Sequence, residues 1–126
     1  MKNFFIIIPV YNDWTNLNQL IKKIKLIAKN NSFKFNILVL NDFSTIKTKI
    51  NLKKNRHIKK LDVLNMYKNL GSQRAIATAL AYLTKYKKKI KQDIIIMDAD
   101  GQDDPNVIKN LIQTFKKKKS DVVVVE

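Results

Sequence analysis

The chain has 126 residues, 45% of them hydrophobic, which gives room for one domain with a globular core. It contains no cysteine, which excludes disulfides and thiolate metal sites and leaves the redox compartment open. The apolar run near the N-terminus is broken by Pro9, is too short to span a membrane, and lacks a small-residue cleavage site. We therefore expect a soluble, cytoplasmic protein.

The formal net charge of +15 would ordinarily indicate an anionic partner such as nucleic acid or a membrane surface. The lysine runs 87–89 and 116–119, however, fall at the ends of predicted helices, where cations complement the helix dipole. The chain also lacks aromatic residues clustered among its lysines. We expect no nucleic-acid partner, although the field of the whole protein attracts anions such as nucleotide phosphates.

The first predicted strand covers residues 4–8, an apolar run rich in isoleucine. A short loop follows at 9–13. Apolar residues then recur at helical spacing from about residue 14 to 29, which predicts an amphipathic helix. We expect Trp14 to anchor this helix on the sheet.

A second strand is predicted at 36–40, and it ends in the acidic turn 41–45. Residues 46–60 are rich in lysine and asparagine with weak periodicity, so we expect a short helix and a loop there. We expect His57, the only histidine of the chain, to be exposed to solvent. A third strand is predicted at 61–66.

The second half continues the alternation with a helix at 71–86, a strand at 94–97, a helix at 107–115 and a fifth strand at 122–125. No Pro/Gly-rich linker interrupts it, so we expect a single domain. Strands alternating with helices predict an α/β fold with a doubly wound, mostly parallel sheet and helices on both faces.

Asp98 and Asp100 directly follow the fourth predicted strand, and Gln102 comes close behind. Residues 94–97 show no polar alternation, which is typical of a strand covered on both faces of a parallel sheet. Ligands of such sheets bind just beyond the carboxyl ends of the strands. The i, i+2 spacing turns both carboxylates to one side of an extended segment. Converging carboxylate and amide oxygens suit Mg²⁺ or Mn²⁺.

An ordinary loop leading into a helix is the alternative, with Asp104 as the N-cap and Pro105 as the first helical residue. That interpretation leaves Asp98 and Asp100 unexplained, because neighbouring carboxylates repel each other unless a cation lies between them. The sequence therefore favours a divalent-cation site.

The glycine content narrows the chemistry further. Gly71 and Gly101 are the only two glycines, so neither a G-x-G-x-x-G turn nor a Walker A loop can form. A nucleotide bound by this chain would have its phosphates neutralised by a metal, not held in a glycine-rich loop.

Four stretches, in order and over nearly the whole chain, resemble the nucleotide-sugar-binding half of family 2 glycosyltransferases. Residues 6–12 (IIIPVYN) are similar to the family's first strand and Pro-x-Tyr-Asn turn, and 39–45 (VLNDFST) to its V-D-D-G-S-T. Residues 69–75 (NLGSQRA) contain its N-x-G. Residues 97–105 (MDADGQDDP) look like the D-x-D-x-Q-(D/N)-x-P of the branch that contains dolichol-phosphate mannose synthase and other polyprenyl-phosphate glycosyltransferases.

The resemblance implies a GT-A fold, whose Rossmann-like half has the strand order 3-2-1-4. It implies transfer of a sugar from a UDP- or GDP-linked donor to a polyprenyl phosphate or glycan, with Mg²⁺ or Mn²⁺ as cofactor. Peripheral association with the inner face of a membrane would fit such an acceptor. In the family the acceptor-side strands and the catalytic base follow the fifth strand, so residues 1–126 read as one domain truncated there, with no catalytic base identified.

The resemblance also implies roles for individual residues around the nucleotide. Asp42 would accept a hydrogen bond from the base, against which Pro9 and Tyr11 would pack. Asp13 would lie near the ribose, and Gly71 would belong to the nucleotide site.

Around the metal, the resemblance places Asp98 beside both the ribose and the cation, with Asp100 and Gln102 as further ligands. A nucleoside diphosphate is a poor leaving group until its charge is neutralised, which a bound metal achieves as a Lewis acid.

Simpler interpretations remain open for several of these residues. Tyr11 could be an ordinary half-buried aromatic residue of a loop. Asp42 could cap the segment that begins near Ser44. Arg74 suits either a diphosphate contact or a surface position on its helix. Phe43 stands where the family has glycine, which predicts a tighter or less polar loop on the base side. For the chain as a whole, the alternative is a non-catalytic nucleotide- or metal-binding module, or a remnant without the acceptor half.

Overall fold

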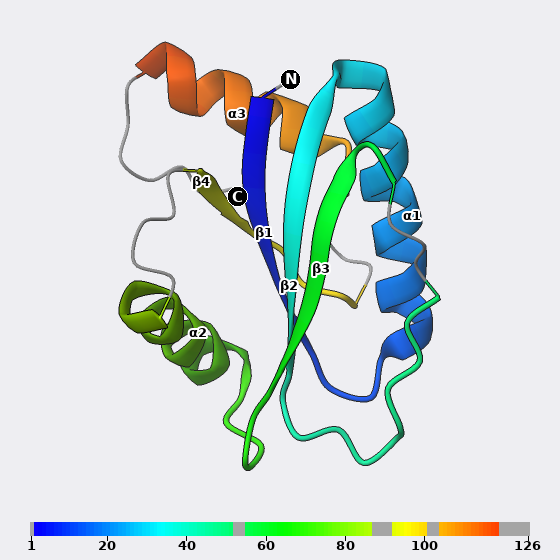
Figure 1. Cartoon of the computed structure of the whole chain (residues 1–126), viewed down its shortest axis with the longest axis vertical. Helices are drawn as coiled ribbons and strands as arrows, with labels where there is room; N and C mark the ends of the chain where they lie inside the picture. Colours follow the sequence, from blue (N-terminus) through cyan, green and yellow to red (C-terminus); the bar gives the residue numbers. More distant parts are fainter. Residues whose placement is uncertain (1, 52–54, 87–91, 101–103, 119–126) are drawn as a thin grey trace.

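The computed structural model describes residues 2–51, 55–86, 92–100 and 104–118. Its strands are β1 (Lys2–Val10), β2 (Phe33–Asn41), β3 (Ile58–Asn65) and β4 (Asp93–Ile96), and its helices are α1 (Trp14–Asn31), α2 (Ser72–Tyr86) and α3 (Val107–Lys118). The four strands form one parallel sheet in the order β3-β2-β1-β4 (Figure 1). The predicted α/β class and strand order are confirmed for the described residues.

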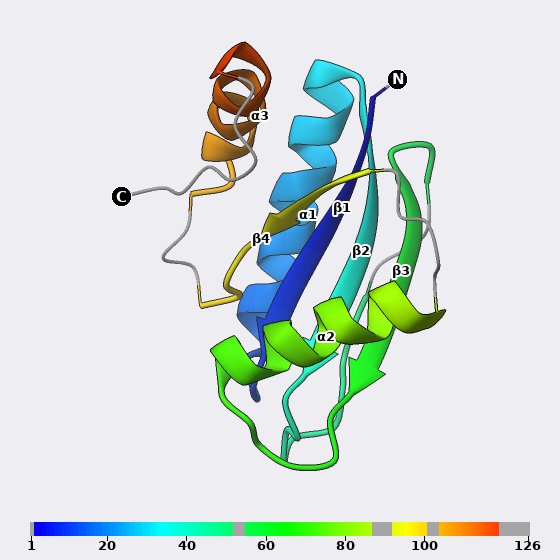
Figure 2. The same cartoon turned by 90° about the vertical axis from the view of Figure 1, so that its left-hand side faces the viewer.

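Helices α1 and α3 cover one face of the sheet and α2 covers the other (Figures 1 and 2). The side chains of successive β1 residues belong alternately to the two cores. Ile6 and Ile8 lie on the α1 side and Ile7 lies on the α2 side. All three are fully buried, which accounts for the unbroken apolar run. Burial of each such side chain contributes about 1.5–3 kcal/mol.

Strand β4 departs from this pattern. Ile95 pairs with Ile6 and is buried, but Ile94 and Ile96, which pair with Phe5 and Ile7 on the α2 side, are 41% and 45% exposed. The strand lies at the edge of the described sheet, and α2 packs over β1 and β2 instead. The prediction that residues 94–97 are covered on both faces is therefore wrong for the α2 face.

Three further predictions about the middle of the chain were wrong. The described residues between Ile46 and β3 contain no helix, and β3 begins at Ile58 instead of residue 61. His57 is partly buried, with Nδ1 3.1 Å from the carbonyl oxygen of Phe33. Because a carbonyl only accepts, this contact requires the proton on Nδ1. The histidine ties the start of β3 to the start of β2.

The start of α3 also differs from the expected cap. A turn precedes the helix, in which Asp104 Oδ1 accepts from Asn106 N at 2.9 Å and Asp104 O accepts from Val107 N at 3.0 Å. Pro105 therefore precedes the helix instead of beginning it. The predicted strand at 122–125 and the lysine run 87–89 lie outside the described residues.

Lys2, at the start of β1, and Lys116 of α3 lie close together, at the end of β1 opposite the cleft aspartates. Lys116 belongs to the last turn of α3, as the helix-end interpretation predicted, and its Nζ lies 5.8 Å from the centre of the Phe4 ring. The close approach of the Lys2 amino group lowers the pKa of Lys116, and desolvation and charge repulsion from Lys2 add to this. Within the described part of the chain, no helix is both long and apolar enough to cross a membrane.

Candidate functional site

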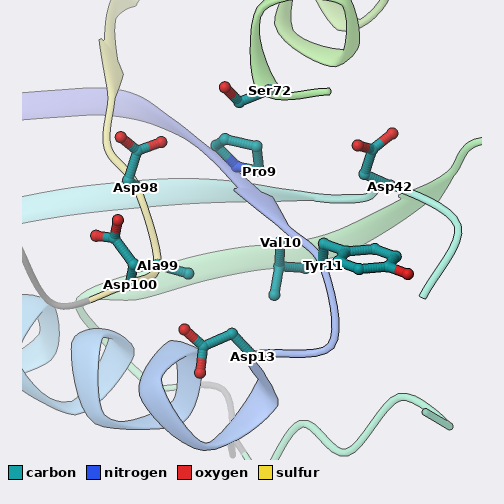
Figure 3. A pocket seen from close by; sticks show the side chains of 9 residues that line it. All are labelled: Pro9, Val10, Tyr11, Asp13, Asp42, Ser72, Asp98, Ala99 and Asp100. Atoms are coloured by element: carbon teal, nitrogen blue, oxygen red, sulfur yellow. The ribbon is translucent and has the colours of Figure 1, made fainter. Parts of the chain in front are cut away.

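The carboxyl ends of β1, β2 and β4 meet at a cleft of about 260 Å³ (Figure 3). After β3 the chain returns to the other side of β1, so the cleft lies where the strand order reverses, the usual ligand position in open α/β sheets. The cleft is lined by Pro9, Val10, Tyr11, Asp13, Asp42, Ser72, Asp98, Ala99 and Asp100. Ligand pockets usually measure about 300–1,000 Å³, so this cleft fits part of a larger ligand.

The β4 side of the cleft carries Asp98 and Asp100. Both are exposed, whereas Met97 and Ala99 are each only 3% exposed, so polar and apolar residues alternate beyond the strand. This alternation turns the two carboxylates to the solvent side together, as the spacing predicted. Met97 N still donates to Ile7 O at 3.1 Å, so the β4–β1 pairing continues up to the first of these aspartates.

Asp42 lies on the opposite side of the cleft and is only 4% exposed. Its Oδ1 accepts from Leu70 N at 2.8 Å and its Oδ2 from Gly71 N at 2.9 Å. The carboxylate thus holds the loop that leads into α2. Ser44 N is instead bonded by Asn41 Oδ1 at 3.0 Å, so the cap proposed for Asp42 at Ser44 is wrong. A carboxylate has about four acceptor positions, so Asp42 keeps some for a ligand.

Tyr11 and Asp13 come from the loop between β1 and α1. Tyr11 is 49% exposed, so about half of the residue's surface is open to solvent, and it lines the cleft. Asp13 occupies the N-cap position of α1, but its side chain makes no cap hydrogen bond, and Oδ2 accepts from Asn16 Nδ2 at 3.1 Å. Both side chains belong to the lining shown in Figure 3.

Residues 5–126 match the family model described as "Glycosyl transferase family 2". The chain belongs to this family. The match includes all the residues that line the cleft, and the four-stranded parallel sheet with three described helices is consistent with a Rossmann-like GT-A half.

Two curated relatives with glycosyltransferase names are similar to this chain. The uncharacterized glycosyltransferase sll0501 of Synechocystis sp. (strain ATCC 27184 / PCC 6803 / Kazusa) is 28% identical over 116 residues, which cover 89% of this chain and 34% of the relative. The uncharacterized glycosyltransferase YkcC of Bacillus subtilis (strain 168) is 24% identical over 115 residues, covering 90% and 34%. This chain of family 2 thus spans about a third of the length of these relatives.

The cleft of the family 2 chain suits a cation held jointly with a ligand. Among the described residues, no three Asp, Glu, His or Cys side chains come close enough to hold a metal by themselves. Mg²⁺, however, is commonly bound by one or two carboxylates together with substrate phosphates and water. The hard oxygens of Asp98 and Asp100 fit that arrangement. No Lys, Arg or His is found among the described residues of the lining.

Six residues that the sequence predicted for the site lie together in the lining of the cleft: Pro9, Tyr11, Asp13, Asp42, Asp98 and Asp100. Gly71 does not line the cleft itself, although its N–H donates to Asp42, which does; Gln102 lies outside the described residues. Arg74 is exposed on the first turn of α2, away from the lining. Ser72 does line the cleft and was missed, although its position directly after the N-x-G stretch was a signal.

Proposed function

We propose that this family 2 chain binds the nucleoside diphosphate of a sugar donor together with Mg²⁺ or Mn²⁺, and that the bound donor serves transfer of the sugar to a polyprenyl phosphate or a glycan. The single observation that supports this best is the cleft itself. It brings an aromatic ring and a buried carboxylate on one side together with two exposed carboxylates on the other.

The β1 and β2 side of the cleft fits the nucleoside. Tyr11 and Pro9 offer flat apolar surfaces against which a base can pack, and the exposed half of Tyr11 keeps the ring accessible. The remaining acceptor positions of Asp42 suit the ring N–H of uracil or guanine. Asp13 lines the cleft and its carboxylate is not used as a helix cap, which supports a role as acceptor from a ribose hydroxyl.

The β4 side fits the diphosphate and its cation. In this proposal Asp98 and Asp100 hold the metal, and Gln102 remains a predicted third ligand. A bound cation would neutralise the charge that develops on the departing diphosphate. The two aspartates also exclude a diphosphate bound without a cation, because like charges repel.

Calorimetric titration of the purified chain tests this proposal. UDP and GDP are each titrated with Mn²⁺ present and with an excess of chelator. We expect one nucleotide to bind with Mn²⁺ and to lose its affinity on chelation. In Asp100→Ala we expect a loss of about 100-fold, since a direct ligand should exceed the 10- to 100-fold effect of outer groups.

Asp93→Ala is the matched control, because it removes the same charge from the other end of β4 and outside the cleft. Its affinity should remain within about twofold, since a distant surface charge is screened by salt. If Asp100→Ala bound the nucleotide as tightly as Asp93→Ala, the metal assignment would be wrong. If a folded parent chain bound neither nucleotide, the proposed donor site would be wrong.

A further inference from the structure

Asn12 lies between two cleft residues, Tyr11 and Asp13, but does not line the cleft itself. Its φ is 60°, in the left-handed region that most side chains avoid and that asparagine tolerates better than most. This backbone conformation sends the chain sharply from the end of β1 into α1. The turn therefore needs a residue that accepts this conformation and is fixed in it.

The side chain of Asn12 is fixed by the turn after β2, more than thirty residues further along the chain. Its Oδ1 accepts from Thr45 N at 2.8 Å and Ile46 N at 3.0 Å, and from Thr45 Oγ1 at 3.3 Å. Its Nδ2 donates to Thr45 Oγ1 at 3.0 Å. Its backbone N donates to Ser44 Oγ at 2.9 Å. One residue thus joins the loop after β1 to the turn after β2.

These two segments carry the base side of the cleft. Tyr11 and Asp13 flank Asn12 directly, and Asp42 comes two residues before Ser44, with its own N donating to Val10 O at 2.9 Å. We infer that Asn12 is a positioning residue that fixes Tyr11 and Asp13 relative to Asp42. This inference rests on the proposed nucleotide site. It adds that Asn12 orders the base side of that site before the nucleotide binds. A loop that is already ordered loses less conformational freedom on binding.

The chain provides a matched control on the same connection. Asn18, on α1, donates from Nδ2 to Lys49 O at 2.6 Å, and its Oδ1 accepts from Asn51 N at 3.1 Å. Asn18 therefore also holds the segment after β2, but from a position one turn into α1. Like Asn12, it lies outside the lining of the cleft. A purely structural role for Asn12 predicts that the two asparagines behave alike.

The test compares Asn12→Gly, which keeps the backbone conformation and removes the side chain, with Asn18→Gly and with the parent. Nucleotide affinity is measured with Mn²⁺, alongside the thermal midpoint of unfolding. We expect Asn12→Gly to bind about tenfold more weakly than Asn18→Gly, since the loop must then be ordered on binding. The thermal midpoints establish that both variants are folded at the temperature of the titration. Equal affinities in the two variants would overturn the inference.

Amide hydrogen exchange gives a second readout that needs no nucleotide. In Asn12→Gly we expect faster exchange at Thr45 and Ile46, which lose their acceptor, and also at Asp42, whose segment is loosened. In Asn18→Gly the loss should be confined to Asn51 and its neighbours. If the parent binds no nucleotide, the proposed function fails, and unchanged exchange at Asp42 in Asn12→Gly would separately overturn the role of Asn12.

Should Asn12→Gly fail to fold, Asn12→Asp replaces it, because a carboxylate keeps the acceptor and also tolerates the left-handed conformation. It loses only the donor to Thr45 Oγ1. Three results together would support the inference. Exchange at Ile46 stays slow, exchange at Tyr11 to Asp13 becomes faster, and nucleotide binding is weaker than in Asn18→Gly. Parent-like exchange and parent-like affinity together would contradict it.

Discussion

The two sides of the cleft differ in how deeply their carboxylates are buried: Asp42 is buried, whereas Asp98 and Asp100 are exposed. On the β1 and β2 side, the carboxylate of Asp42 and the amide of Asn12 accept hydrogen bonds from backbone N–H groups of distant segments. On the β4 side, Asp98 and Asp100 are exposed and follow the edge strand of the described sheet. The first side is part of the folded framework, whereas the second presents charge to solvent. Substitutions on the two sides should therefore change different quantities.

The largest expected effect on stability is that of Asp42→Ala. It removes both acceptors of a buried carboxylate and leaves the N–H groups of Leu70 and Gly71 without them. We expect the free energy of unfolding to fall by about 3 kcal/mol, since bonds to charged groups contribute about 1.5–3 kcal/mol each and overlap in part. Urea denaturation followed by circular dichroism measures it.

Asp100→Ala is the counterpart on the other side. An exposed carboxylate beyond a strand end should change the free energy of unfolding by less than about 0.5 kcal/mol. Asp42→Asn, with one acceptor oxygen left, should fall between the two variants. Similar stabilities of Asp42→Ala and Asp100→Ala would remove the distinction between a framework side and a charged side.

Gly71→Ala should also destabilise the framework side. Gly71 has a φ of +80°, and no atom lies within 4 Å of the position that a Cβ would take. The destabilisation therefore comes from the backbone conformation alone, about 1–2 kcal/mol. Gln73→Ala, an exposed change to alanine inside α2, should stay within about 0.5 kcal/mol. Equal unfolding midpoints in urea for the two variants would show that the left-handed turn is not needed.

Phe43→Gly should act in the opposite direction. Phe43 has a φ of 60°, a left-handed backbone conformation that is strained for a residue with a Cβ. The residue is also 55% exposed, so little burial offsets this strain. Glycine should relieve about 1–2 kcal/mol of backbone strain, but its greater unfolded-state entropy offsets part of this. We expect the free energy of unfolding to rise by about 0.5–1 kcal/mol. Phe43→Ala removes the ring but keeps the strained Cβ, so it should gain nothing. A gain in Phe43→Ala equal to that in Phe43→Gly would assign the effect to the ring.

The sequence predicted those parts of the molecule that depend on local signals. Apolar runs and helical spacing give the strands, the helices and their alternation. Because carboxyl ends of parallel strands share one edge, site residues at and just beyond these ends were expected to meet, and six of them do line one cleft. The roles of these residues with a nucleotide and that of Gln102 as a metal ligand stay predictions.

The parts that sequence reasoning missed depend on long-range partners. Asp42 bonds to Leu70 and Gly71, 28 and 29 residues away, and no local pattern distinguishes this bond from a cap at Ser44. The link from Asn12 to Thr45 is equally non-local. His57 stood in a basic segment without periodicity, yet β3 begins beside it and its ring reaches Phe33. An apolar strand also gives no sign of whether a helix covers one face or both.

The smallest expected effect tests this last point. Ile96→Thr should change the free energy of unfolding by less than about 0.5 kcal/mol, because Ile96 is 45% exposed on the face that α2 leaves open. Ile95→Thr, one residue away, should lose about 2 kcal/mol, since it places a hydroxyl among buried apolar side chains. Urea denaturation of the two variants decides between a strand covered on one face and one covered on both. Equal losses would mean that both isoleucines are buried in solution and that something covers the α2 face of β4. The charged side of the cleft would then follow a strand as firmly packed as β1.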